Sequence, residues 1–417
     1  MKHLHFWILQ TGEPLPIDGS NTRGMRPMNL TKALNARGHR VVLWSTDFYH
    51  QEKKHRFGCD KNIRISDLLE IRLITSRGYQ RNIGPARFFD HAQLGWRFNK
   101  LACKVEKPDL AFIGFPPIEI AAAAVRHCRL RGVPTLLDVK DLWPDLFEDP
   151  LPAPLRPVAR LILSPLRTKS EITMREATGI CGTTDAYLEW ARTRGGRKPC
   201  TNDIVAPITP EEERISDDQL RAAESWWDER GILADSRPRA CFVGNLGRTS
   251  DFTPIIRAAK MPHFQQWQFV IAGSGDQQER WTSMARSAEN IIFSGRINLP
   301  KISSLFERST IALAPFQRIS NYRLNVPNKI NDYLSHGLHV VTPLDGPTRT
   351  LLTAVGAGHF YNDESHISFA KAILEAYNTI DDAERTRVKS KFASIVDPSL
   401  TYERLVDHIE HVAAQSK

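Results

Sequence analysis

The chain of 417 residues is poor in cysteine and has no long apolar run. Its six cysteines are scattered, without a Cys-x-x-Cys pair or a histidine at metal-ligand spacing, which argues against a disulfide framework or a zinc site. No segment approaches the roughly 18 uncharged apolar residues of a membrane-spanning helix, and the best stretch, 110–125, contains two prolines and Glu119. The amino terminus lacks the long apolar stretch and the cleavage site of a signal peptide. We therefore expect a cytoplasmic protein.

Low-complexity segments and short repeats are also missing, and a content of 41% hydrophobic and 25% charged residues is ordinary for a globular protein. The length suits two or three domains. The net charge of +9 is uneven: residues 1–200 carry 32 Lys and Arg against 20 Asp and Glu, whereas residues 201–417 carry 24 against 27. The positive first half favours an acidic partner there, such as phosphate groups, an anionic membrane surface or nucleic acid.

An apolar run, a polar turn and an amphipathic helix repeat along the chain. Glycines that can end a helix in the left-handed conformation stand at Gly38, Gly132 and Gly337, and each is followed by an apolar run typical of a buried parallel strand. The pattern predicts an α/β fold of two facing Rossmann-like doubly wound domains. The predicted strands are 4–10, 40–45, 109–114, 134–138, 178–182 and 203–206, then 240–244, 268–272, 290–294, 310–314 and 339–342.

The strand pattern pauses in the middle of the chain, which gives the domain boundaries. We expect an N-terminal Rossmann-like domain over 1–206, a linker with an acidic helix over 207–234, and a C-terminal Rossmann-like domain over 235–395. Residues 396–417 are expected to form a closing helix that returns to the N-terminal domain. Ligands of such folds bind beyond the carboxyl ends of the strands, so the residues at those ends matter most.

In the second domain, the strand ends are rich in glycine and basic residues. Gly244, Asn245 and Arg248 follow one strand, Gly295 and Arg296 follow another, and Lys329 and Asp332 lie at the start of a helix. Backbone N–H groups at a helix start, together with the Lys329 charge, suit a phosphate, and Asp332 could accept hydrogen bonds from ribose hydroxyls. Taken singly, these are equally ordinary turns, a solvated arginine and a surface pair at i, i+3.

In the first domain, a glycine- and proline-punctuated loop over 11–24, which contains Glu13, follows the first predicted strand. Arg26 then begins a helix, where its charge opposes the helix dipole unless an anion lies nearby. Lys140 and Asp141 follow another strand end, beside Asp138. Their charges fit acid–base work or the binding of sugar hydroxyls, and equally a structural ion pair.

The segment 151–166 alternates apolar residues with Arg156 and Arg160. It could lie on an anionic membrane surface, or it could be a core-facing helix with a solvated basic face. Aromatic and basic residues also interleave between Tyr79 and Arg97. No nucleic-acid-binding signature accompanies them, so nucleic acid is not an expected partner.

These segments resemble a retaining glycosyltransferase of family 4 with the GT-B architecture, in the subgroup of bacterial surface-polysaccharide enzymes. The most specific match is Asp141-Leu142-Trp143-Pro144, similar to the DLWP motif of that subgroup. Two further matches are Phe242-Val243-Gly244-Asn245-Leu246-Gly247, similar to the first donor-domain strand, and the segment from Pro327 to Gly337, similar to PSKxxEYLAxG. The likeness extends over nearly the whole chain.

The resemblance implies a hexosyltransferase that moves a sugar from a nucleotide donor, UDP favoured over GDP, to a saccharide or lipid-linked acceptor. It implies catalytic roles for Lys140, Asp141 and Lys329. Donor contacts would come from Gly244, Asn245, Arg248, Gly295, Arg296, Lys329 and Asp332, and acceptor or membrane contacts from Glu13, Arg26, Arg156 and Arg160. No metal or other cofactor is expected.

The implied setting is exopolysaccharide, capsule or O-antigen (lipopolysaccharide) synthesis, peripherally on the cytoplasmic face of the inner membrane. Leu324 departs from the family, since it stands where relatives carry the first of two glutamates. Two alternatives stay open: a sugar-nucleotide epimerase of the same architecture, and a non-catalytic sugar-nucleotide binder.

Overall fold

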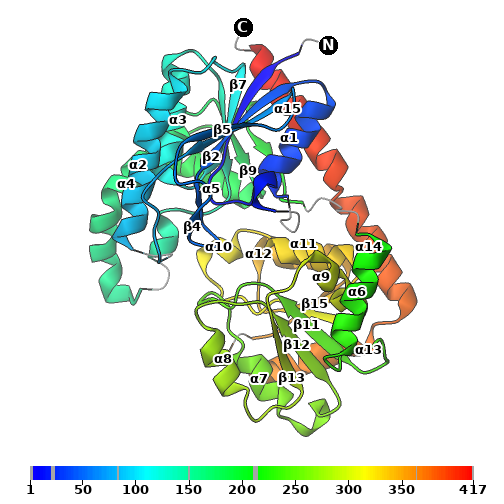
Figure 1. Cartoon of the computed structure of the whole chain (residues 1–417). Coiled ribbons are helices and arrows are strands. Elements are labelled where there is room, and N and C mark those ends of the chain that lie inside the picture. Colours follow the sequence, from blue (N-terminus) through cyan, green and yellow to red (C-terminus); the bar gives the residue numbers. More distant parts are fainter. Residues whose placement is uncertain are drawn as a thin grey trace. The chain divides into compact units, whose positions relative to one another are not determined.

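The structure is a computed structural model that describes residues 3–19, 24–81, 84–148, 151–209, 215–362 and 364–415. It divides into two compact units, which we call unit 1 (Met1–Glu211 with Pro398–Lys417) and unit 2 (Glu212–Asp397) (Figure 1). Some predictions extend outside the described residues: positions 20–23 of the loop 11–24, positions 210–214 of the linker, and positions 416 and 417 at the end of the closing helix.

Unit 1 is built on an eight-stranded sheet in the order β10-β9-β8-β7-β1-β2-β6-β5. Its pairs are parallel except for β5, which runs antiparallel to β6 at the edge. The strands are β1 (His5–Leu9), β2 (Arg40–Thr46), β5 (Lys61–Arg64), β6 (Leu69–Ile74), β7 (Leu110–Phe115), β8 (Thr135–Val139), β9 (Gly179–Gly182) and β10 (Ile204–Val205), beside a hairpin of β3 (Phe48–Tyr49) and β4 (Lys54–His55).

Helices cover both faces of this sheet, because its central strands are apolar on both sides. Along β1, Phe6 and Ile8 face a core shared with α1, whereas Trp7 packs edge-on against Trp44 and Phe98. The helices are α1 (Arg26–Ala36), α2 (Pro85–Ala102), α3 (Ile118–Leu130), α4 (Arg156–Glu176), α5 (Asp185–Gly195) and α15 (Pro398–Gln415), with short 3-10 turns η1 (Pro16–Asp18), η2 (Asp145–Phe147) and η3 (Ala153–Leu155).

The last helix, α15, packs beside α1 in unit 1, although nearly 200 residues of unit 2 separate it in sequence from the rest of that unit (Figure 1). Leu405, Val406 and Ile409 are buried in the core that contains Phe6 and Leu30. The Arg37 guanidinium lies 2.6 Å from Asp407, which adds an ion pair at the rim of this contact.

Unit 2 is built on a six-stranded parallel sheet in the order β13-β12-β11-β14-β15-β16. Its strands are β11 (Arg239–Val243), β12 (Gln268–Ala272), β13 (Ile291–Gly295), β14 (Ile311–Leu313), β15 (His339–Thr342) and β16 (Gly358–Phe360). The strand order reverses between β11 and β14. In this Rossmann order, such a reversal opens the crevice in which nucleotides bind.

The helices of unit 2 are α6 (Asp217–Asp228), α7 (Thr253–Ala259), α8 (Gln278–Met284), α9 (Leu299–Glu307), α10 (Ser320–Arg323), α11 (Asn328–Ser335), α12 (Gly346–Val355), α13 (His366–Asn378) and α14 (Asp382–Ile395), with the short η4 (Pro262–Phe264). α7 and α13 share one core, and α6, α9, α11 and α14 share the other. α6, in the segment predicted as a linker, packs on α9, and its Trp227 indole donates to the Lys301 carbonyl over 2.8 Å.

The predicted fold class is confirmed: two Rossmann-like α/β units with parallel sheets and a long C-terminal helix. The predicted strands 268–272 and 339–342 coincide with β12 and β15. β5, β6 and β16 were not predicted from the sequence. β5 is polar and exposed, and β16 has three residues, so neither has a clear apolar pattern. Among the described residues, no helix is both long enough and apolar enough to cross a membrane.

Candidate active site

In unit 2, three loops at the carboxyl ends of neighbouring strands are tied together by backbone hydrogen bonds. The Gly244 N–H donates to the Ala272 carbonyl over 2.9 Å, and the Leu246 N–H donates to the Ser274 carbonyl over 3.0 Å. The Gly273 N–H in turn donates to the Gly295 carbonyl over 2.7 Å. The loops after β11, β12 and β13 therefore form one continuous backbone surface at this edge of the sheet.

Two of these loop positions need glycine because neighbouring atoms lie too close to leave room for a side chain. A Cβ atom at Gly244 would overlap the Lys329 ammonium, and one at Gly273 would overlap the Gly244 carbonyl oxygen. Any side chain at either position would push apart the loops or the lysine. The glycine-rich turns seen in the sequence thus bring a backbone and a cation together at one place.

Lys329 is the second residue of α11, where the backbone N–H groups of the first turn have no partner inside the helix. Tyr333, one turn further on, fixes the helix to the sheet. Its buried hydroxyl donates to the Leu313 carbonyl of β14 and accepts from the Val243 N–H of β11, each over 3.2 Å. Pro327 forms the N-cap of α11.

Two aromatic rings surround the Lys329 ammonium. Its Nζ lies 4.1 Å from the ring centre of Phe242 and 4.7 Å from that of Phe316, distances at which a cation is attracted to a ring face. Burial nevertheless lowers the pKa of Lys329 to about 7, because the charge of Asp332 only partly offsets the loss of water. A diphosphate bound here would place further negative charge beside the ammonium.

The other predicted donor residues lie around this edge of unit 2. Asn245 is exposed, directly after Gly244, and Asp332 is half-buried one turn beyond Lys329. Arg248 is exposed and pairs with Asp276 over 3.2 Å. Gly295 has a φ of 74° and Arg296 beside it is exposed. The loops after β11 and β13 and the start of α11 thus hold all of these residues.

In unit 1, the corresponding strand ends carry a buried network of charges. The Lys140 ammonium lies 2.5 Å from Glu13, 2.7 Å from the Gln10 side-chain oxygen and 3.8 Å from Asp138. Glu13 and Lys140 were predicted from separate segments, and the structure joins them. Asp141, next in the chain, is half-buried.

Arg26 lies deeper than its neighbours, with only 1% of its side chain exposed. Its guanidinium is 3.5 Å from Asp138 and donates to the Ala206 carbonyl. Asp138 is therefore the anion that compensates a positive charge at the start of α1. The predicted contact between Arg26 and an acceptor stays a prediction.

A further cluster beside this network was missed in the sequence, although several of its residues had been noted as an aromatic and basic stretch. The Tyr79 hydroxyl lies 2.6 Å from His50 Nδ1, and Arg87 stands over the Trp143 ring at 4.7 Å. Burial and the charges of Lys53 and Arg87 lower the pKa of His50 to about 4. Tyr79 and Trp143 are both buried, so the cluster packs these rings against cations, and Trp143 belongs to the Asp141–Pro144 segment.

Among the described residues, no three His, Cys, Asp or Glu side chains are arranged to hold a metal ion. Arg156 and Arg160 lie on the first turns of α4, where Arg156 donates to the Leu151 carbonyl and Arg160 pairs with Glu148.

Comparison with known proteins agrees with this geometry. Residues 24–201 match the family described as glycosyl transferase 4-like domain, and residues 237–379 match the family described as glycosyl transferases group 1. No curated protein sequence is significantly similar to the chain.

Solved structures share the fold over the whole chain. One is α,α-trehalose 6-phosphate synthase from Burkholderia multivorans, 13% identical with a TM-score of 0.67, which covers 100% of both chains. A second is Anabaena HepE in complex with UDP and glucose, 11% identical with a TM-score of 0.64, over 98% of this chain and 100% of that one. A third is the catalytic domain of Arabidopsis thaliana starch synthase IV with ADP and acarbose, 11% identical with a TM-score of 0.64, over 99% and 100%.

The fold and the family matches together define a nucleotide-sugar-dependent glycosyltransferase with the GT-B architecture. The chain belongs to the group 1 glycosyltransferases, family 4, and is a retaining enzyme.

Proposed function

We propose that this glycosyltransferase moves a sugar from a UDP-sugar to a saccharide or lipid-linked acceptor in the synthesis of a bacterial surface polysaccharide. The observation that carries the donor half of the proposal is Lys329. A lysine that burial holds at a pKa of about 7, at a helix start and against a glycine backbone, suits a diphosphate. UDP is preferred because HepE, of the same fold, was solved with UDP.

Each donor contact follows from a position on this edge of unit 2. Lys329, Asn245 and the Gly244 backbone would contact the diphosphate, with Arg248 reaching it after leaving Asp276. Asp332 would accept hydrogen bonds from the ribose. Gly295 and Arg296 would lie beside the base.

The transfer step needs no enzymic nucleophile. The acceptor hydroxyl oxygen bonds to the anomeric carbon while the bond from that carbon to the diphosphate oxygen breaks, on the same face of the sugar. The proton of the acceptor passes to an oxygen of the departing diphosphate. Lys329 and the first N–H groups of α11 stabilise the negative charge that develops there, in the manner of an oxyanion hole.

The acceptor would bind unit 1. Lys140 and Asp141 follow β8 at the carboxyl edge of the sheet, and Glu13 lies 2.5 Å from Lys140. In the proposal, Lys140 and Glu13 orient the acceptor hydroxyl, and a change at either would reduce turnover more than donor binding.

Peripheral contact with an anionic membrane is the second part of the proposal. Leu155, Val158, Leu161 and Ile162, at the start of α4, are between 52% and 76% exposed. Apolar residues presented to solvent on a helix that also carries arginines are typical of an interfacial helix.

The experiment is a thermal-shift screen with UDP, GDP, ADP and dTDP, followed by the matching nucleotide sugars. Saturation at a hundred times the dissociation constant should stabilise the protein by about 2.7 kcal/mol. Lys329→Met should abolish the shift, and Lys371→Met, which removes an exposed lysine of unit 2, should not. Conversion of the donor sugar without an acceptor would point to an epimerase, and no shift with any nucleotide would contradict the proposal.

A further inference from the structure

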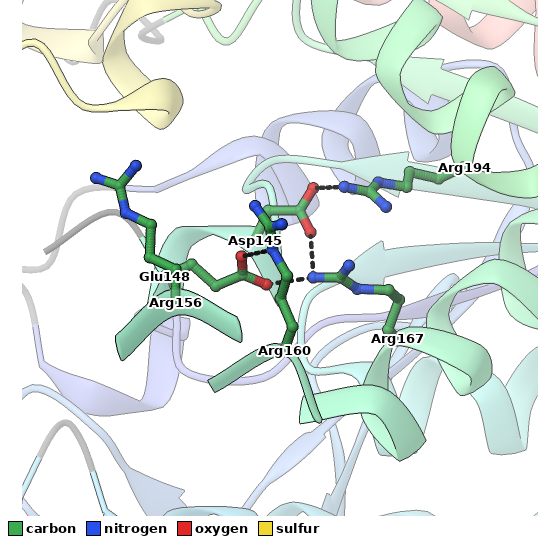
Figure 2. Close-up of a pocket in the computed structure, with 6 residues that line it drawn as sticks. All are labelled: Asp145, Glu148, Arg156, Arg160, Arg167 and Arg194. Carbon is green, nitrogen blue, oxygen red and sulfur yellow. Dashed lines mark hydrogen bonds and ion pairs between the residues drawn. The ribbon is translucent and has the colours of Figure 1, made fainter. Parts of the chain in front are cut away.

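Unit 1 contains a pocket of about 330 Å³ lined by four arginines and two carboxylates: Asp145, Glu148, Arg156, Arg160, Arg167 and Arg194. It lies directly after the Asp141–Pro144 segment. The carboxylates stand on η2 and at its end, and the arginines come from α4 and α5 (Figure 2). Its volume is far above the roughly 30 Å³ of one water molecule.

The two carboxylates hold some of the guanidinium groups in place. Arg167 bridges them, since it pairs with Asp145 over 3.4 Å and also with Glu148. Arg194 pairs with Asp145, and Arg160 donates through Nε to Glu148 over 2.8 Å. Partial burial would raise the pKa of Glu148, but the hydrogen bond from Arg160 and the charge of Arg167 keep it below the usual value. Glu148 is therefore ionised at neutral pH.

Cations outnumber anions in this pocket by two. Arg156 donates only from Nε, to the Leu151 carbonyl over 3.1 Å, and Arg160 uses only Nε. Among the described residues, the terminal nitrogens of both side chains have no hydrogen-bond partner. The ion pairs within the pocket leave the terminal nitrogens of these two arginines unused, and a doubly charged anion would balance the excess charge and occupy these donors.

The apolar side of α4 indicates what the anion is attached to. At 100° per residue, Leu155, Val158, Leu161 and Ile162 fall on the side of the helix opposite Arg156 and Arg160. Both sets are exposed, so the helix offers apolar groups on one side and guanidinium groups with available terminal nitrogens on the other. A helix with its side chains is about 10–12 Å across, so a lipid whose chain runs along the apolar side can reach the pocket with its headgroup.

We propose that this pocket binds the diphosphate of a lipid-linked acceptor, with the lipid chain against Leu155, Val158, Leu161 and Ile162. The inference rests on the proposed function and selects, from its acceptors, a prenyl-type diphosphate lipid. It gives Arg156 and Arg160 the role of direct contacts to the diphosphate, and Asp145 and Glu148 the role of orienting Arg194 and Arg167.

The test compares the binding of farnesyl diphosphate, inorganic diphosphate, farnesol and phosphatidylglycerol vesicles to the full chain. Wild-type protein should bind farnesyl diphosphate at least tenfold more tightly than either inorganic diphosphate or farnesol. Arg156→Gln and Arg160→Gln should each weaken that binding about tenfold, the effect of losing a hydrogen bond between charged groups. Arg126→Gln, which removes an exposed arginine of α3, is the matched control and should change nothing.

Equal binding of farnesyl diphosphate by the wild type and both variants would overturn the proposal. So would a loss confined to phosphatidylglycerol vesicles, which would make the pocket a site for membrane headgroups, or binding of inorganic diphosphate as tight as that of the lipid. Arg156 and Arg160 are exposed, so the variants should keep the wild-type unfolding temperature. UDP-glucose binding is measured in parallel: if it persists while farnesyl diphosphate fails, only this inference fails, and if it is absent in the wild type, the proposed function fails.

Discussion

Lys329 should take up a proton when the donor binds. In the free enzyme, burial lowers its pKa to about 7, so at pH 8 only about one lysine in eleven is protonated. A diphosphate beside the ammonium favours the charged form and raises the pKa again. Binding at pH 8 should therefore draw about 0.9 protons from the buffer, and at pH 6 about 0.1.

The same coupling between protonation of Lys329 and donor binding makes the affinity for the donor depend on pH. If only the protonated form binds, the donor Kd should be flat below pH 7 and rise with pH above it. Between pH 7 and pH 9 it should increase about 50-fold. A pKa raised by two units in the complex corresponds to about 2.7 kcal/mol of coupling between the ammonium and the diphosphate.

The assay is calorimetric titration of UDP-glucose in buffers of different ionisation enthalpy, at pH 6, 7, 8 and 9. UDP-glucose suits it because its diphosphate, esterified at both ends, does not titrate in this range. Lys329→Met should abolish the proton uptake. Arg248→Gln should retain it at a weaker affinity, because Arg248 is exposed and Lys329 is still present in this variant. A proton uptake near zero at pH 8, with a Kd that does not change up to pH 9, would refute the reasoning.

Three further predictions concern positions that the structure makes critical. Gly244→Ala should weaken donor binding at least tenfold without unfolding the protein, since its Cβ displaces the Lys329 ammonium; an unchanged Kd by calorimetry would contradict this. Tyr333→Phe should lower the free energy of unfolding, measured in urea, by about 1–3 kcal/mol, because the Val243 N–H and the Leu313 carbonyl each lose a hydrogen-bond partner. An unfolding free energy equal to that of the wild type would show that the hydroxyl does not fasten α11. Arg26→Met should lower the free energy of unfolding by about 3–5 kcal/mol, because it leaves Asp138 buried with Lys140 as its one remaining nearby cation among the described residues. The double variant Arg26→Met/Asp138→Leu should recover much of that stability. Equal losses of stability in the single and double variants would count against the ion pair.

The apolar strands and the helices between them could be predicted from the sequence because burial on both faces leaves a continuous apolar run. β12 and β15 are such strands. The edge strand β5 could not be predicted in this way, because its residues are polar and gain their partners only from pairing with β6. An edge strand exposed to solvent lacks the pattern that marks a buried one.

At the candidate site, local motifs in the sequence pointed to individual residues, but the contacts between residues far apart in the sequence could not be predicted. The glycines and the helix start placed Lys329, but Phe316 and Phe242 meet it only after folding. Arg26 illustrates the limit in the other unit, since its counter-ion, Asp138, lies 112 residues further along the chain. No spacing rule connects the two, and only the sheet brings them together.

The packing of α15 on α1 gives the chain an order of maturation during synthesis. The core of unit 1 includes side chains from α15, so this unit cannot be completed until α15 has been translated. Unit 2 ends at Asp397 and can close first. Translation proceeds at roughly 5–20 residues per second, so unit 2 takes on the order of ten seconds or more to be made. During that time, the apolar surface of unit 1 that α15 later covers would be exposed to solvent. A stop codon placed just before α15 would thus leave unit 1 with an incomplete core and leave unit 2 intact.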